Sequence, residues 1–241
     1  MPEFRSRKAL VNPELRRRGI YLLPNLFTTA ALFAGFYAIV QAMTDRFEQA
    51  AVAIFIAMIL DGLDGRVARL TRTQSAFGAE YDSLSDMVSF GVAPALVMFE
   101  WAMKGMGKWG WIAAFIYCVG AALRLARFNT NIEVIDKRFF QGLPSPAAAA
   151  LIAGFVWVLM DLNYTGEEVR WYAWALTIFA GVTMVSNFRY YSGKDINLRR
   201  SVPFIAVLAI VLFFVLVSSY PPGILFALFL CYAFSGYIMA V

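Results

Sequence analysis

The stretch at residues 50–70, AAVAIFIAMILDGLDGRVARL, decides the fold class of this chain. It starts as an unbroken apolar run and then places acidic and basic side chains in the same segment. Two more acids follow, at the spacing Asp61-x2-Asp64-Gly65-x2-Ala68-Arg69-x8-Gly78-x3-Asp82-x3-Asp86. A carboxylate that faces lipid at the centre of a membrane helix costs about 3 kcal/mol. We therefore expect the four aspartates to face something other than lipid.

The composition is typical of an integral membrane protein. Of the 241 residues, 61% are hydrophobic and 15% are charged, and the mean hydropathy is +0.64, whereas soluble domains average roughly 45–50% apolar and 25% charged residues. The composition does not change along the chain and no repeat is visible, so we predict a single domain over residues 1–241. Histidine is absent, and Cys118 and Cys231 lie far apart in apolar segments. These facts exclude imidazole chemistry, a Cys-x2-Cys metal site and a disulfide framework.

Eight segments are apolar and long enough to cross a bilayer core about 30 Å thick. They lie near residues 23–43, 47–70, 82–101, 109–129, 144–162, 169–188, 202–219 and 222–240. We therefore predict an all-α, polytopic bundle of about eight transmembrane helices. The first apolar run lacks a small-residue cleavage site, so we expect it to be retained in the protein. Residues 9–20 mix apolar and basic side chains, which predicts a short interfacial helix, with a disordered basic arm as the alternative.

The basic residues predict the orientation of these spans. With the N-terminus inside, 17 of the 21 lysines and arginines fall on the inner side, and only Arg46, Lys104, Lys108 and Arg170 fall outside. This bias is the positive-inside pattern. The net charge of +5 could suggest nucleic-acid binding, but this distribution of the basic residues argues against it. Near the outer helix ends lie all six tryptophans: Trp101, Trp109, Trp111, Trp157, Trp171 and Trp174. We expect a multi-pass protein of the cell (inner) membrane with the aspartates at the cytoplasmic ends of their helices.

The first half of the spaced motif forms one polar face of a helix. Asp61, Gly65 and Arg69 recur at every fourth residue, and Asp64 and Ala68 run alongside them. Because Gly65 and Ala68 carry little or no side chain, a ligand or a neighbouring backbone can approach closely between the acids and the arginine.

The second half places two further carboxylates opposite the first pair. Asp82 and Asp86 are four residues apart on the next helix, Gly78 lies one turn earlier, and residues 71–77 supply the turn. Carboxylates this close repel one another unless cations lie between them. Because the cluster offers oxygen ligands without histidine or cysteine, it favours Mg²⁺ or Mn²⁺, and magnesium usually completes its shell with phosphate oxygens. A purely structural role for the acids, or a cation or proton path in a transporter, is the alternative interpretation.

The complete motif resembles the signature of the CDP-alcohol phosphotransferase family, D-x2-D-G-x2-A-R-x8-G-x3-D-x3-D, at every fixed position. The resemblance implies a two-metal site whose ligands are Asp61, Asp64, Asp82 and Asp86, with Asp86 also acting as the catalytic general base. The residues that the resemblance places at CDP-diacylglycerol are Pro24, Asn25, Leu26, Phe27, Asp61, Gly65, Ala68, Arg69, Ser75 and Gly78. The implied reaction joins the lipid phosphate to an alcohol and releases CMP.

Three further stretches, at residues 124–129, 140–146 and 184–190, bear on the identity of the alcohol. Together they resemble the membrane-embedded, bacterial-type phosphatidylserine synthases within the family, which implies L-serine as acceptor, phosphatidylserine as product and a homodimer. Candidates for binding serine are Arg124, Arg127, Asn129 and Arg189. These arginines also fit inner-side anchors or contacts to phospholipid headgroups, and residues 142–146 also fit a simple turn into the fifth span. Glycerol 3-phosphate or inositol phosphate as acceptor, and a cation-coupled or proton-coupled transporter, are the competing hypotheses.

Overall fold

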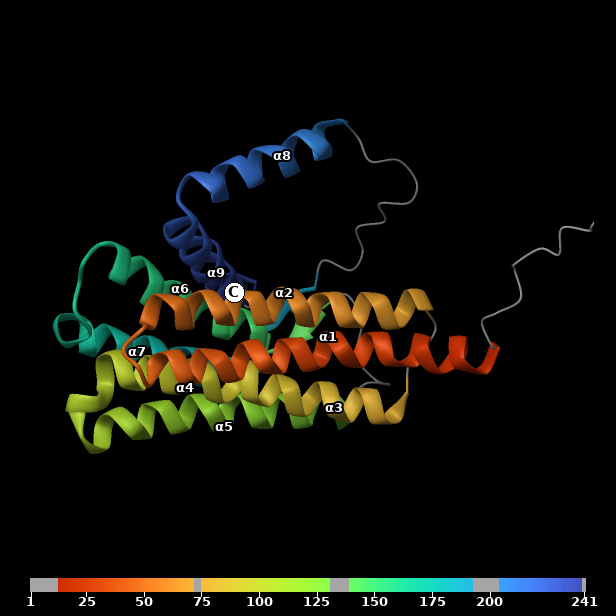
Figure 1. Cartoon of the computed structure of the whole chain (residues 1–241). Helices are drawn as coiled ribbons and strands as arrows, with labels where there is room; N and C mark the ends of the chain where they lie inside the picture. The colour runs from red at the N-terminus through yellow and green to blue at the C-terminus, as the bar shows by residue number, and fades with distance from the viewer. Residues whose placement is uncertain (1–12, 72–74, 131–138, 193–203, 240–241) are drawn as a thin grey trace, which may run out of the picture.

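The structure is a computed structural model that describes residues 13–71, 75–130, 139–192 and 204–239. The chain is mostly helical, and Figure 1 shows long helices lying side by side as an antiparallel bundle. The elements are α1 (Pro13–Ala42), α2 (Phe47–Thr71), α3 (Ala76–Asp86), η1 (Met87–Val92), α4 (Ala93–Met98), η2 (Phe99–Met103), η3 (Lys104–Met106), α5 (Lys108–Thr130), β1 (Phe139–Gln141), α6 (Ser145–Asp161), α7 (Gly166–Val185), β2 (Arg189–Tyr191), α8 (Phe204–Ser219) and α9 (Pro221–Ile238). The predicted helical class is thus confirmed, with one small sheet that the all-α prediction omitted.

Four helical segments in the described part of the chain are long and apolar enough to cross a membrane. They are Pro24–Ala42, Ala76–Met106, Lys108–Thr130 and Pro221–Ile238. The helix α6 and the segment Val207–Ser219 of α8 are apolar but shorter, and α2 carries four charged residues in its last turns. These findings support a membrane protein, whereas the predicted number of eight spans is not confirmed.

Small side chains bring α1 and α2 together. The buried face of α1 carries Ala31, Ala34, Ala38 and Ala42, and the facing side of α2 carries Ala50, Ala53 and Ala57, all buried. Such stripes let two helix backbones approach closely, and α1 packs more extensively on α2 than on any other element. Followed toward the opposite end of the pair, the same two stripes reach Thr28 on α1 and Asp64 on α2. The packing of the hairpin therefore determines where Asp64 lies.

The third rod of the bundle runs from α3 to η3, and it is held to α1 by two buried serines. Ser85 Oγ donates to the Thr28 carbonyl at 3.1 Å, and Ser89 Oγ donates to the Ala31 carbonyl at 3.1 Å. A Cβ atom at Gly35 would lie 2.6 Å from the Ser89 Cα, so glycine is needed for this close approach. Directly after Asp86 the rod turns into the π-helical segment η1, and such segments occur frequently at functional sites.

The centre of the bundle is α6, most of which is buried between α2, α4, α7 and α9. The tryptophans lie at the bundle end opposite the aspartates, as the order of the antiparallel helices requires. Trp109, Trp111 and Trp171 are exposed there, whereas Trp101 is only 8% exposed and packs edge-on against Phe155. Trp101 is thus part of the core rather than of an aromatic belt. Both cysteines are free.

A short antiparallel ribbon, which the sequence analysis does not predict, lies just before α6 and just after α7. In β1 and β2, Phe140 pairs with Tyr190 and Gln141 pairs with Arg189. Gly142 then turns the chain into α6 with a φ of +75°, and its N–H donates to the Phe188 carbonyl at 2.8 Å. The buried Tyr190 hydroxyl donates to the Ala233 carbonyl of α9 at 2.8 Å. The turn predicted at residues 142–146 is therefore present, and the ribbon anchors it to α9.

The two ends of the chain differ from the predicted arrangement. The helix α1 begins at Pro13 and continues through Pro24 without a break, so the described part of the predicted interfacial segment belongs to α1, and residues 9–12 lie outside the described residues. Figure 1 shows α8 standing apart from the bundle, and its principal contact is with α9.

Candidate active site

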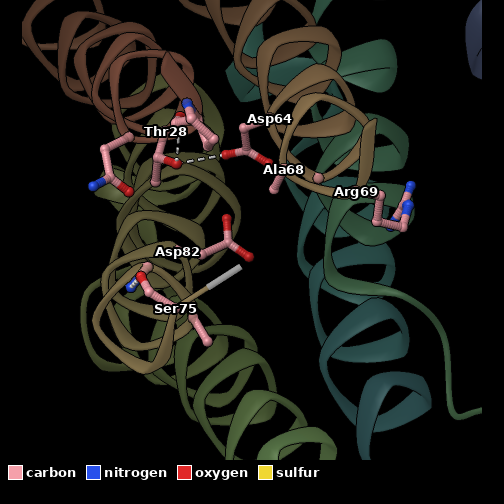
Figure 2. A pocket seen from close by; sticks show the side chains of 11 residues that line it. Thr28, Asp64, Ala68, Arg69, Ser75 and Asp82 are labelled. Atoms are coloured by element: carbon pink, nitrogen blue, oxygen red, sulfur yellow. Dashed lines mark hydrogen bonds between the residues drawn. The ribbon is translucent and has the colours of Figure 1, made fainter. Parts of the chain in front are cut away.

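The site begins with a hydrogen bond between the first two helices. Thr28 Oγ1 donates to Asp64 Oδ2 at 2.7 Å, where the alanine stripes of α1 and α2 end (Figure 2). Thr28 is 4% exposed and Asp64 is 5% exposed. The sequence analysis did not single out Thr28, although it stands one helical turn after Pro24, on the face of α1 that Pro24 shares. That spacing was the signal available to find it.

Three of the four aspartates form one group. One carboxylate oxygen from each of Asp61, Asp64 and Asp82 can be chosen so that all lie within 4.8 Å of one another. Figure 2 shows Asp64 and Asp82 pointing toward a common space between α2 and α3. Asp82 Oδ1 is buried and has no hydrogen-bond partner among the described residues. An oxygen-only group with an unpaired buried carboxylate atom fits a hard divalent cation such as Mg²⁺ or Mn²⁺.

A cavity of about 300 Å³ adjoins this group. Its lining residues are Pro24, Asn25, Thr28, Asp64, Gly65, Ala68, Arg69, Ser75, Gly78, Ala79 and Asp82. Seven of the ten residues predicted at CDP-diacylglycerol therefore line one cavity, and Asp61 lies in the adjoining acid group. Leu26 and Phe27 do not line it, because each successive residue turns about 100° around a helix and carries them away from the face of Pro24, Asn25 and Thr28. Ala79 lines the cavity although it is not a fixed position of the motif.

The two glycines of the motif, Gly65 and Gly78, are explained by different features of the structure. A Cβ at Gly78 would lie 3.1 Å from Ser75 Oγ and 3.5 Å from Asn25 Oδ1, so this glycine lets the two polar groups reach the cavity wall. A Cβ at Gly65 would meet only Arg69 Nη1, at an ordinary 3.7 Å. Packing among the described residues therefore does not require glycine at position 65, and its missing side chain leaves room on the cavity side. Arg69 is exposed at the rim.

The N-terminus of α3 faces the cavity through Ser75 and Gly78. Ser75 is the N-cap of α3, and its hydroxyl accepts a hydrogen bond from the Gly78 N–H at 3.0 Å. Unpaired N–H groups and the helix dipole make such a terminus favourable for phosphate oxygens. The cavity thus combines a helix N-terminus, a rim arginine and an acid group suited to a metal.

Asp86 lies one turn further along α3 than Asp82 and is not part of the three-carboxylate group. Its side chain is within hydrogen-bonding reach of Asp61. Arg124 of α5, which is 9% exposed, interacts electrostatically with Asp86 and Asp61. Arg124 Nη1 donates to the Ser145 hydroxyl at 2.6 Å. Asp86 therefore faces a second polar environment, formed by α5 and the first turn of α6.

The other residues predicted to bind serine are not gathered at one point. Arg127 Nη1 donates to the Ser186 carbonyl and to Asn187 Oδ1, both at 3.3 Å, beyond the last turn of α7. Asn129 Nδ2 donates to Ser83 Oγ at 3.0 Å, next to Asp82 along the chain. Arg189 is exposed in β2. Among the described residues, Arg124 is the only one of the four candidates that interacts with the aspartates.

Several known proteins are similar to this chain in sequence. Residues 21–182 match the CDP-alcohol phosphatidyltransferase family. A protein of Helicobacter pylori named CDP-diacylglycerol–serine O-phosphatidyltransferase is 40% identical over 181 residues, which cover 74% of this chain and 75% of the relative. Proteins with the same name are 39% identical in Mycobacterium bovis over 70% of this chain and 60% of the relative, and 41% identical in Methanocaldococcus jannaschii over 57% and 61%. This chain belongs to the CDP-alcohol phosphatidyltransferase family.

Proposed function

We propose that this protein transfers the phosphatidyl group of CDP-diacylglycerol to L-serine, forming phosphatidylserine and CMP. The observation that carries the proposal is the group of three carboxylates within 4.8 Å beside a cavity with a helix N-terminus and an arginine at its rim. The names of the relatives support serine as the acceptor.

In this reaction the serine hydroxyl oxygen attacks the phosphorus nearer the lipid. A new P–O bond to serine forms while the P–O bond to the CMP leaving group breaks, and the hydroxyl proton passes to a carboxylate, which we assign to Asp86. A divalent cation held by Asp61, Asp64 and Asp82 would neutralise the charge that develops on the diphosphate. Arg69 and the N-terminus of α3 would hold phosphate oxygens.

The open backbone at Gly65 supports this use of the cavity. Among the described residues no atom closely approaches the place of the missing side chain, which leaves room for a substrate to lie against α2. The same reasoning disfavours a transporter, since an ion path needs neither a phosphate-sized space nor an arginine at its rim.

The test is CMP release from CDP-diacylglycerol by the purified protein. We expect release to require serine and Mg²⁺ or Mn²⁺, to stop with EDTA, and to fall by about 10²–10⁴-fold in Asp86→Asn, as is usual for loss of a general base. Asp82→Asn should also abolish release. The matched control is Asp45→Asn, because Asp45 has a φ of 58°, which asparagine tolerates, in the turn at the far end of α2. Serine-dependent release that survived both site substitutions would refute the site.

An acceptor panel separates serine from the competing alcohols. Serine, glycerol 3-phosphate and inositol phosphate are offered singly to the wild-type protein, with sealed vesicles to detect ion flux. Turnover with a phosphorylated acceptor and not with serine would overturn the serine assignment but leave the transfer reaction standing. Ion flux without CMP release would overturn both.

We also propose that the helical rods of the described residues (α1, α2, α3 to η3, α5, α6, α7, α8 and α9) cross the inner membrane, with the N-terminus and the aspartates on the cytoplasmic side. The bias of basic residues supports this orientation. Labelling of single cysteines placed at residues 45 and 163 from outside intact cells would test it, since these turns join helices at the end opposite the aspartates. The homodimer is proposed on the family resemblance and is tested by the mass of the purified protein.

A further inference from the structure

The buried pair of Arg124 and Ser145 has no role in the transfer step as written above. Ser145 is fully buried in the first turn of α6, and its hydroxyl accepts a hydrogen bond from Arg124 Nη1 at 2.6 Å. Within the described residues that hydroxyl donates to no acceptor. Arg124 Nε is buried and has no hydrogen-bond partner there either. An unpaired buried polar atom is costly, so Arg124 Nε calls for a partner that the described residues do not supply.

The charge on Arg124 is opposed by Asp86 and Asp61 without direct contact. Both acids interact with it electrostatically, but the only ion pair within 4.0 Å among the described residues joins Lys104 and Glu100. The hydroxyl groups of the neighbouring Tyr117 and Tyr232 are hydrogen-bonded to backbone carbonyls rather than to Arg124. Tyr117 donates to the Phe90 carbonyl at 3.0 Å, and Tyr232 donates to the Tyr191 carbonyl at 3.1 Å. Among the described residues, no ion pair within 4.0 Å therefore neutralises the buried Arg124 guanidinium.

We propose that Ser145 is a positioning residue for the acceptor, holding Arg124 so that Arg124 binds the serine carboxylate while Asp86 receives the hydroxyl proton. The proposal rests on the proposed function. Serine carries its hydroxyl and its carboxylate on adjacent carbon atoms, so one molecule spans the two groups. Arginine binds carboxylates through paired N–H donors, and among the described residues Arg124 Nε has no partner while Nη1 is bound to Ser145.

The arrangement of the chain explains why Ser145 fixes this geometry. The turn before α6 is rigid, because Gly142 and Leu143 donate to the Phe188 and Thr183 carbonyls at 2.8 and 3.1 Å. A Cβ at Gly142 would collide with the Met184 carbonyl, so this turn cannot shift without moving the end of α7. A hydroxyl on such a turn fixes a long side chain that would otherwise sample several rotamers. The turn at residues 142–145 thereby acts on the acceptor through Arg124.

The experiment measures CMP release by the purified full chain against serine and against CDP-diacylglycerol. Ser145→Ala should raise the KM for serine by about tenfold or more, as for the loss of one charge-assisted hydrogen bond, and should leave the KM for CDP-diacylglycerol within about twofold. Arg124→Lys should also raise the KM for serine. In the double variant the two effects should not add, because Ser145 acts through Arg124. The control is Thr177→Ala, which removes a fully buried hydroxyl that bonds only within its own helix.

The outcomes separate the two levels of the proposal. If the wild type uses serine and Ser145→Ala leaves the KM for serine unchanged, the positioning role is wrong and the proposed function stands. A fall in kcat with both KM values unchanged, or additive effects in the double variant, would assign Ser145 a merely structural role. If the wild type uses another acceptor instead of serine, the proposed function and this inference both fail.

Discussion

Replacing Thr28 by valine tests how the packing of α1 on α2 prepares the acid group. Valine keeps the shape of threonine and removes only the hydroxyl that donates to Asp64 Oδ2 at 2.7 Å. Because Thr28 is 4% exposed, little water can replace that donor. A hydrogen bond to a charged group contributes about 1.5–3 kcal/mol, and each 1.4 kcal/mol is about tenfold in an equilibrium constant. We therefore expect Thr28→Val to weaken divalent-metal binding by about 10–100-fold, the range found for groups that orient metal ligands.

The assay is CMP release at saturating CDP-diacylglycerol and serine, titrated with Mg²⁺. The concentration for half-maximal release should rise about 10–100-fold, while release at saturating metal recovers most of the wild-type rate. Thr177→Val is the matched control, because its buried hydroxyl donates to the Ala173 carbonyl in α7, away from the aspartates. An unchanged metal requirement in Thr28→Val would show that Asp64 does not depend on this bond. A rate that no metal concentration restores would mean that Thr28 acts on the substrate instead.

Two further predictions concern the framework that holds the site. Gly35→Ala should lower both the melting temperature in detergent and the activity, because its Cβ would lie 2.6 Å from the Ser89 Cα. The control Gly62→Ala, whose Cβ meets no atom of another described residue within 4 Å, should be neutral or stabilising by up to about 1 kcal/mol. Equal melting temperatures of the two variants would contradict the close approach of α1 and η1. Tyr190→Phe should lower the free energy of unfolding by about 1–3 kcal/mol, because it leaves the buried Ala233 carbonyl unpaired. Chemical denaturation in micelles measures this loss. A loss below about 0.5 kcal/mol would mean that the β1–β2 ribbon is not anchored through this hydroxyl.

Local spacing explains which parts of the site could be read from the sequence. Asp61 and Asp64 share a helix face with Gly65 and Ala68 because every helix repeats after 3.6 residues, whatever surrounds it. The structure places Gly65, Ala68 and Asp64 on one cavity and Asp61 beside them. The family resemblance, not spacing, places Leu26 and Phe27 at CDP-diacylglycerol, and the helical repeat turns them away from the cavity that Pro24 and Asn25 line, so their contact with the substrate stays a prediction.

Segments far apart in the chain account for what the sequence did not predict. The pairing of β1 with β2 joins residues separated by a whole helical hairpin, and nothing in either short stretch specifies the partner. Likewise, the sequence leaves Arg124 open as an anchor or a substrate contact, and its bond to Ser145 depends on how α5 packs near the start of α6. Trp101 was placed in an aromatic belt because it lies near a helix end, yet the packing of its neighbours buries it.

The sequence by itself determined the helical membrane class and the spacing of the acids, because composition and helical periodicity are properties of each segment alone. Only the tertiary structure decided that Asp61, Asp64 and Asp82 converge while Asp86 stays outside their group and interacts with Arg124, and that Thr28 is bound to the acid group. The physical reason is that side chains from different helices meet only where close packing sets the distance between the backbones, and small residues such as Gly35 set that distance here.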